Sequence, residues 1–184
     1  MPLIWPPLKQ RRPLYRRLRR AWDWLGRPPW LGEWLIRTSL PRYVIGALGL
    51  VWDAEDRVLL VRQSYRAPGW ALPGGGVRAG ETLEACLIRE MAEELGWDIE
   101  VGPVVGIVGG TYAHLPIGIA NVGFVCRWRA GVFCPSDEVR EIRYLSVEQA
   151  VRRVAAGIQP LIQMAAVQRR RELARPPPLQ ILQA

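Results

Sequence analysis

Residues 75–97, GGVRAGETLEACLIREMAEELGW, join a glycine-rich turn to a stretch of helical periodicity. At about 100° per residue, the apolar side chains between residues 83 and 95 are expected on one helix face. They are Leu83, Leu87, Ile88, Met91, Ala92 and Leu95. Glu90, Glu93 and Glu94, at relative positions i, i+3 and i+4, are expected together on the opposite side. The stretch therefore predicts an amphipathic helix with an acidic face directly after a glycine turn.

The acidic face has two interpretations. Three carboxylates at this spacing repel one another, at about a few tenths of a kcal/mol per like-charge pair. A solvated acidic face is the plainer interpretation. The other is a site for a hard divalent cation, because Mg²⁺ prefers oxygen ligands and often bridges protein carboxylates to substrate phosphates. The glycine turn in front of the helix favours the cation site.

The same stretch resembles the Nudix box. That motif reads Gly, five residues, Glu, seven residues, Arg-Glu, an apolar residue, any residue, Glu-Glu, any residue, Gly and an apolar residue. The chain matches it at Gly75, Glu81, Arg89, Glu90, Met91, Glu93, Glu94, Gly96 and Trp97. Leu72-Pro73-Gly74 precedes the box, as in many members. On these residues the sequence is identified as a member of the Nudix hydrolase family.

The resemblance implies an α/β fold, a Nudix-type α/β/α sandwich with a mixed β-sheet, over roughly residues 42–157. It implies Mg²⁺ or Mn²⁺ bound by Glu90, Glu93 and Glu94, with the backbone carbonyl of Gly75 joining the metal shell. One of the three glutamates would act as the base. Glu81 and Arg89 would form a structural pair that holds the loop on the helix.

The implied reaction is hydrolysis of a diphosphate bond in a nucleoside diphosphate linked to another group X. The products would be a nucleoside monophosphate and phosphorylated X. Two other functions stay open: an RNA 5′-end pyrophosphohydrolase, and a Nudix module that senses a nucleotide without turning it over. The complete set of glutamates argues against the second of these.

Relatives often use a further acid outside the box. The candidates are Asp137, Glu138 and Glu141, of which Glu138 is preferred; the alternative is a solvated acidic turn. Phosphate contacts are expected from Arg62, Arg66 or Arg78, since a guanidinium binds phosphate through two hydrogen bonds. Tyr112 or Trp70 could stack on a base, although either could lie in the core. The single histidine, His114, is expected to form hydrogen bonds within a loop rather than to catalyse.

The remaining periodicity predicts strands and helices around the box. A strand from Arg42 to Asp53 and a second from Arg57 to Tyr65 are expected to form a hairpin, followed by a short strand at residues 70–72. Further strands are expected near residues 99–109, 120–129 and 141–145, with a hairpin over 130–136. Helices are expected at 147–156, with Ser146 and Gln149 at its start, and from Pro160 to about Leu173.

Charge divides the 184-residue chain. The net charge of +8 lies entirely in residues 1–42, which hold ten basic and two acidic residues; the remainder holds fifteen of each. Residues 1–41 also carry five of the nine tryptophans and predict a helical arm. The arm could pack on its own domain or in a homodimer, adsorb to an anionic membrane surface, or contact nucleic acid. The expected organisation is this arm, a Nudix domain at 42–157, and a helix with a Pro-rich tail at 158–184.

Cysteines and apolar runs indicate the compartment. The three cysteines, Cys86, Cys126 and Cys134, have no metal-ligand spacing and are expected to be free, which fits a reducing cytoplasm. A Cys126–Cys134 disulfide across a hairpin is the minor alternative. The sequence contains no run of 18 apolar residues, so no membrane-spanning helix is expected, and no signal peptide is expected either. A cytoplasmic enzyme is therefore predicted.

Overall fold

The computed structural model describes residue 20 and residues 42–64, 69–111 and 117–173. The chain divides into two units, residues 1–41 and residues 42–184, and each is considered by itself. Only Arg20 is described in the first unit, so the predicted arm lies outside the described residues. Tyr112, His114 and Arg66 lie outside them as well.

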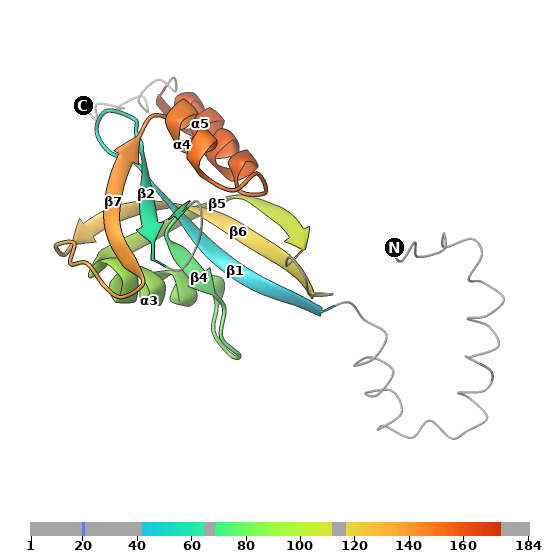
Figure 1. The fold of residues 1–184 in the computed structure, drawn as a ribbon. Helices are drawn as coiled ribbons and strands as arrows, with labels where there is room; N and C mark the ends of the chain where they lie inside the picture. Colours follow the sequence, from blue (N-terminus) through green and yellow to red (C-terminus); the bar gives the residue numbers. More distant parts are fainter. Residues whose placement is uncertain (1–19, 21–41, 65–68, 112–116, 174–184) are drawn as a thin grey trace, which may run out of the picture. The chain divides into compact units, whose positions relative to one another are not determined.

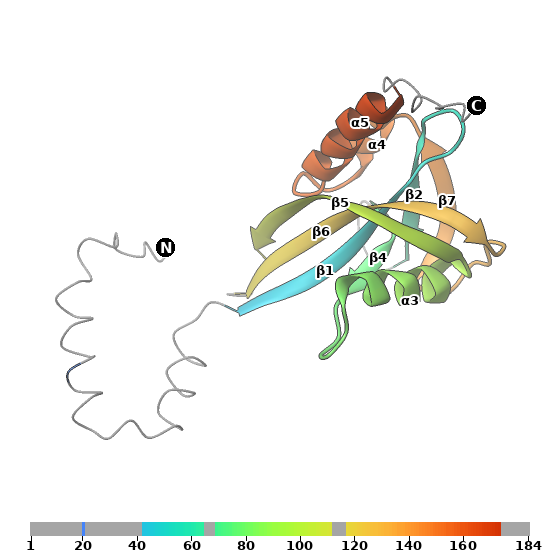
Figure 2. The ribbon, with the colours of Figure 1, turned by 180° about the vertical axis from the view of Figure 1, so that it is seen from behind.

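The second unit is an α/β/α sandwich built on two sheets (Figure 1). The strands of the first sheet run in the order β4-β1-β6-β5, and those of the second in the order β3-β2-β7. Helix α3 covers one face, and helices α4 and α5 cover the other, as the front and back views both show (Figures 1 and 2). The strands are β1 Arg42–Val51, β2 Val58–Gln63, β3 Trp70–Ala71, β4 Gly74–Gly76, β5 Asp98–Thr111, β6 Ile117–Ala130 and β7 Val139–Leu145; the helices are α3 Leu83–Leu95, α4 Val147–Arg153 and α5 Gln159–Leu173.

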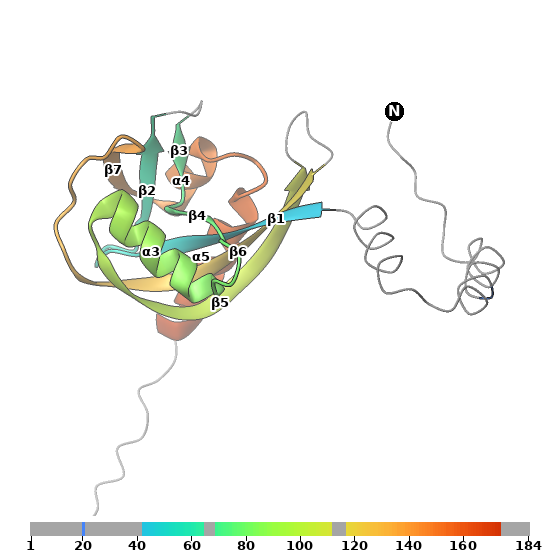
Figure 3. The ribbon, with the colours of Figure 1, turned by 90° about the horizontal axis from the view of Figure 1, so that it is seen from below.

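Strand β1 is central to the first sheet. It pairs in parallel with β6 along its whole length, from Arg42 opposite Ile117 to Val51 opposite Cys126, and antiparallel with β4. The β1–β6 pair is the parallel pair that makes this sheet mixed, because β5 pairs antiparallel with β6. Seen from below, α3 lies across β1 (Figure 3).

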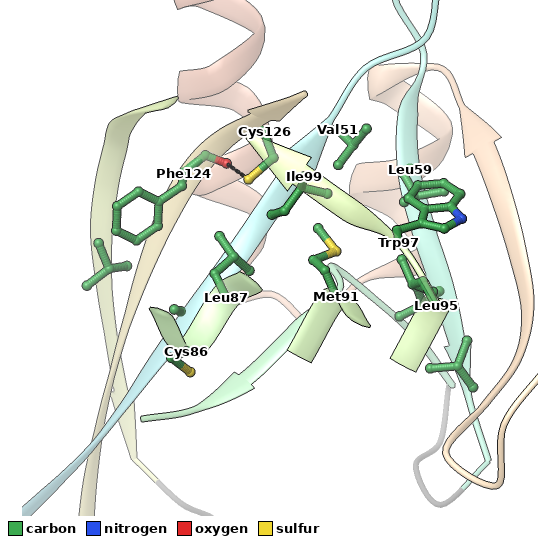
Figure 4. Close-up of a cluster of buried hydrophobic side chains, with 14 residues drawn as sticks. Val51, Leu59, Cys86, Leu87, Met91, Leu95, Trp97, Ile99, Phe124 and Cys126 are labelled. Atoms are coloured by element: carbon green, nitrogen blue, oxygen red, sulfur yellow. Dashed lines mark hydrogen bonds between the residues drawn. The ribbon is translucent and has the colours of Figure 1, made fainter. Parts of the chain in front are cut away.

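Successive side chains of β1 point to opposite faces, so each face has its own core. On the α3 side, Ala47 and Val51 pack with Leu87, Met91 and Phe124, among others (Figure 4). On the other side, Leu50 packs with residues from α4 and α5; they are Ala150, Leu161, Ile162 and Ala165. Helix α5 therefore completes a core of the same unit.

Two predicted hairpins are wrong. Strands β1 and β2 lie in different sheets, and an isolated antiparallel bridge between Trp52 and Val58 links their ends. Strands β6 and β7 also lie in different sheets, so residues 131–138 cross from one sheet to the other. Both turns have hairpin composition, but the long-range parallel pairing of β1 with β6 decides which strands become neighbours.

The helix ends follow local sequence. The Thr82 hydroxyl accepts a hydrogen bond from the Ala85 amide at 3.1 Å, and Gly96 ends α3 with a left-handed φ of 69°. The predicted capping box of Ser146 and Gln149 is present at the start of α4. Helix α4 ends at Arg153, three residues before the predicted end at Ala156. Helix α5 begins at Gln159 with Pro160 in its first turn, as predicted.

The first glycine of β4 is predicted to be essential for stability. Gly74 has a φ of +126°, and a Cβ there would lie 2.2 Å from the carbonyl oxygen of Ala47. Gly74→Ala should therefore lower the free energy of unfolding by at least about 2 kcal/mol in chemical denaturation, through backbone strain and this clash. Gly76→Ala is the matched control, because a Cβ there meets nothing within 4 Å. Equal stability of the two variants would contradict this account of β4.

Candidate active site

Helix α3 places its acidic residues differently from the predicted single acidic face. Glu94 is only 4% exposed, whereas Ile88 and Ala92, both predicted to be on the apolar face, are exposed. The reason is helical geometry: Glu94 follows Leu87 by seven residues, about two full turns, and so lies on the same side of the helix as Leu87. Glu90 and Glu93 lie further round, and Glu93 is exposed to solvent.

The buried Glu94 carboxylate contacts strand β4. Its Oε2 accepts a hydrogen bond from the backbone amide of Gly74 at 3.1 Å. Burial raises the pKa of Glu94 to about 7; the hydrogen bond from Gly74 opposes this shift, and the charges of Glu90, Glu138 and Glu93 add to it. Within the described residues, no Arg or Lys forms an ion pair with Glu94. The helix therefore holds a carboxylate whose charge has little compensation.

Arg89 holds the rest of the box together. Its guanidinium donates to Glu81 at 2.8 and 3.1 Å, to Glu90 at 2.7 Å and to Glu93 at 3.1 Å. It also donates to the carbonyl of Gly76 at 3.3 Å. This includes the Glu81–Arg89 pair that the resemblance implies. The hydrogen bonds from Arg89 and from the Arg78 amide lower the pKa of Glu81 to about 2, so Glu81 is ionised at neutral pH.

The acidic residues line one cavity of about 380 Å³. Its walls are Arg78, Glu90, Glu93, Glu94, Ser136, Asp137 and Glu138. The segment 131–138 thus brings Glu138, the acid preferred from sequence, to the same cavity as the three glutamates of the box. Arg78 also lies there, 3.4 Å from Glu93.

Other predicted residues lie elsewhere. Arg62 is paired with Glu141 at 3.3 Å on the second sheet, and neither lines the glutamate cavity. Trp70 is partly buried against the core beside α4 and α5, with the Arg143 guanidinium 5.4 Å from its ring centroid. Cys126 is buried, Cys134 is exposed and both are free, so the alternative of a disulfide is wrong.

The donor chemistry of the glutamate cavity fits a divalent cation. Carboxylate oxygens of Glu90, Glu93, Glu94 and Glu138 make an all-oxygen set, which Mg²⁺ and Mn²⁺ prefer. In residues 42–64, 69–111 and 117–173, no group of three His, Cys, Asp or Glu side chains has the arrangement of a metal-ligand set. Glu90 and Glu93 each accept a hydrogen bond from Arg89 instead. Cation binding would therefore need Glu90 and Glu93 to release Arg89.

A second cavity, of about 270 Å³, lies against the same glycine strand. Gly74, Gly75 and Gly76 line it together with Gln63 and Asn121, among others. Gln63 is 8% exposed, and no described residue bonds its buried Oε1. A Cβ on Gly46, opposite Asn121 in the sheet, would lie 2.5 Å from the Asn121 Oδ1, so this glycine makes room for the amide.

Sequence reasoning missed both amides. Each is a polar residue within an otherwise apolar strand, and that is the signal that could have found them. The predicted phosphate contact is the neighbour of Gln63, Arg62, but adjacent strand residues face opposite sides: Arg62 is exposed and Gln63 is buried.

Comparison with known proteins identifies the protein family to which this chain belongs. The NUDIX domain matches residues 42–165, so the chain belongs to this family and is a Nudix hydrolase. Members of the family use divalent metal ions and act on nucleotides or their derivatives. No helix in the described part of the chain is long and apolar enough to cross a membrane.

Individual relatives share the family of this chain, but their names do not agree on one substrate. The chain is 30% identical over 118 residues to a MutT-like protein of Streptomyces ambofaciens, which covers 64% of this chain and 73% of that protein. It is 53% identical over 55 residues to a Mycobacterium tuberculosis protein whose name proposes 8-oxo-dGTP diphosphatase activity, covering 26% of this chain but only 39% of that protein. The crystal structure of a MutT protein from Methanosarcina mazei shares the fold with 23% identity and a TM-score of 0.61, covering 75% of this chain and all of that one.

Arg89 is predicted to stabilise the fold as well as the site. Arg89→Ala leaves Glu81 without its guanidinium partner and should lower the free energy of unfolding by about 2 kcal/mol, measured by chemical denaturation. Arg78→Ala is the control: Arg78 is 63% exposed, against 17% for Arg89, and should change stability by less than about 0.5 kcal/mol. An Arg89→Ala protein as stable as the wild type would show that the network is not structural.

Glu94 is predicted to make the metal-free protein less stable as pH rises. Because the folded pKa of about 7 exceeds the ordinary value of 4.5, the folded protein holds an extra proton between these values. The contribution of Glu94 to stability is then highest below about pH 4.5 and is lost as pH rises through 7. Relative to wild type in EDTA, Glu94→Gln should gain about 2–3 kcal/mol in unfolding free energy between pH 5 and pH 8. A difference independent of pH would refute the raised pKa.

Proposed function

We propose that this protein hydrolyses a diphosphate bond in a nucleoside diphosphate linked to another group X, with Mg²⁺ or Mn²⁺ bound at the glutamate cavity. The products are a nucleoside monophosphate and phosphorylated X. The observation that carries the proposal is the buried Glu94 carboxylate. It has no basic partner among the described residues, and it faces the cavity that Glu90, Glu93 and Glu138 also line. A buried carboxylate without a basic partner is typical of a cation-binding or catalytic residue.

The residues that would hold the cation are Glu90, Glu93 and Glu94, with the carbonyl of Gly75 and, from the second sheet's side, Glu138. When bound, the cation neutralises the diphosphate and lowers the pKa of a water molecule. Gly75 lies close to Glu90, since a Cβ on Gly75 would lie 2.5 Å from that carboxyl group. Arg89 would keep Glu81 as its partner while releasing Glu90, because the Glu81 contact uses different nitrogens, Nε and Nη2.

The nucleoside would occupy the second cavity. Strand β4 lines this cavity, and Glu94 contacts the same strand through Gly74. A nucleotide with its base in one cavity therefore places its phosphates toward the other. The Gln63 Oε1, which no described residue bonds, can accept a hydrogen bond from a base N–H, and the Asn121 amide can donate or accept. Arg78, at the edge of the glutamate cavity, would contact a phosphate; Arg62 and Tyr112 remain proposed substrate contacts from sequence alone.

The size of X distinguishes the candidate substrates. The relative from Mycobacterium tuberculosis suggests a nucleoside triphosphate, in which X is a phosphate group and phosphorylated X is diphosphate. An RNA 5′ end is the second candidate, favoured by the ten basic residues in positions 1–42. A panel of nucleoside triphosphates, including 8-oxo-dGTP, nucleotide sugars and 5′-triphosphate RNA separates them. For RNA, affinity should fall steeply with salt; for a mononucleotide, Asn121→Ala should raise KM more than it lowers kcat.

The glutamate cavity is predicted to be essential for turnover. Glu94→Gln removes a ligand charge at constant volume and should lower kcat/KM at least about 100-fold, while EDTA should abolish wild-type activity. Glu100→Gln is the matched control, because Glu100 pairs with Arg129 at the surface, lines neither proposed substrate cavity and should keep full activity. Full turnover by Glu94→Gln, or in EDTA, would sink the proposed mechanism.

A further inference from the structure

A third cavity, of about 740 Å³, lies apart from the proposed active site. It shares no lining residue with the glutamate cavity or with the cavity that contains Gln63 and Asn121. Five aromatic side chains line it, and they come from strands and turns of both sheets: Trp52, Trp97, Trp128, Phe133 and Tyr144. It lies beyond the end of β1, whereas the opposite half of β1 lines the Gln63 cavity. We call it the aromatic cavity.

The aromatic cavity is open to solvent on one side. Trp97 is buried, but Trp128 is 48% exposed and Val132 is 85% exposed. Large apolar side chains exposed around a cavity indicate a binding surface. The charged lining is balanced, with Asp53 and Glu172 against Arg127 and Arg169. An uncharged, apolar ligand therefore suits this cavity better than a polyphosphate does.

The end of α5 forms part of the wall. Arg169 and Glu172 line the cavity, and α5 ends at Leu173. Arg169 is anchored there: its guanidinium donates to the Asp56 carboxylate at 2.5 Å and lies 5.7 Å from the ring centroid of Trp52. The chain therefore leaves α5 at the edge of the aromatic cavity.

The residues that follow have the composition such a cavity binds. Residues 174–184 read ARPPPLQILQA, with three successive prolines from Pro176 to Pro178 and then Leu179. Proline-rich segments in the polyproline II conformation dock into aromatic-lined grooves, and they lose little conformational entropy in doing so. Four extended residues span about 13 Å, so Pro176 can reach the cavity from Glu172.

We propose that the aromatic cavity is the docking site of the chain's own residues 174–184, with Pro176–Leu179 against Trp128 and its aromatic neighbours. Tethering places this segment at an effective concentration of about a millimolar, so that even a weak contact is populated. Docking in this way would cover the exposed faces of Trp128 and Val132. This proposal is independent of the hydrolase activity.

A labelled peptide tests the proposal directly. Fluorescein-labelled ARPPPLQILQA is titrated with the full chain and with a variant lacking residues 174–184, and anisotropy is measured. The peptide should bind the shortened variant at least about 10-fold more tightly than the full chain, whose own tail competes. A peptide with serines in place of Pro176, Pro177 and Pro178 should not bind. Equal binding to both chains, or binding of the serine peptide, would overturn the proposal.

Substitutions in the shortened variant locate the site. Trp128→Ala should weaken peptide binding at least about 10-fold, as should Val132→Asp, which changes a solvent-exposed side chain and keeps the fold. Val167→Ala is the control, since Val167 is also an exposed apolar residue but lies on α5 outside the aromatic cavity. Thermal melting confirms that each variant is folded. Unchanged binding by Val132→Asp, or equal loss by Val167→Ala, would place the peptide elsewhere.

Sedimentation distinguishes a tail that docks on its own chain from one exchanged between two copies. Docking within one chain predicts the same molecular mass for the full chain and the shortened variant. A full chain that dimerises and a shortened variant that is monomeric would overturn docking within one chain.

Discussion

The contact between the Glu94 carboxylate and the Gly74 amide joins the chemistry of this protein to its fold. It fastens α3, whose glutamates line one proposed substrate cavity, to β4, whose glycines line the other. The contact requires glycine at position 74, because its positive φ and the nearby Ala47 carbonyl leave no room for a side chain. It also requires Glu94 to be buried, which is why its pKa rises to about 7. The Glu94 carboxylate thus lies on the buried face of α3 at a cost in stability, and a bound cation would offset that cost.

Arg89 has the opposite effect on the same helix. Its hydrogen bonds to Glu81, Glu90 and Glu93 compensate three carboxylates and bind the Gly76 carbonyl as well. The same bonds occupy oxygens that a cation would need. Two partners therefore compete for the glutamates of the box. Glu90 and Glu93 can either accept hydrogen bonds from the Arg89 guanidinium or bind a metal ion. The Glu81–Arg89 pair can persist in both, since Glu81 does not line the glutamate cavity.

Strand β1 and helix α5 run between the two ends of this unit. The first half of β1 lines the cavity with Gln63 and Asn121, and the residues after its end line the aromatic cavity. Ile158, just before α5, lines the cavity with Gln63 and Asn121, and Arg169 and Glu172, near the end of α5, line the aromatic cavity. The buried side chains of α5, including Leu161 and Ile162, hold both ends in position. Variants at the aromatic cavity should therefore be tested for stability before any effect on turnover is interpreted.

Sequence alone determined what depends on neighbours along the chain. The box at residues 75–97, the helix from Leu83 to Leu95, the capping box at Ser146 and the start of α5 at Pro160 all follow from patterns of a few residues, because caps, turns and helical periodicity are local. Tertiary structure decided the rest. β1 and β2 lie in different sheets because β1 pairs with β6, about 75 residues further on. The burial of Glu94, the meeting of Glu138 with the box, and the cavity with Gln63 and Asn121 depend on which surfaces pack together, and no spacing along the chain encodes that.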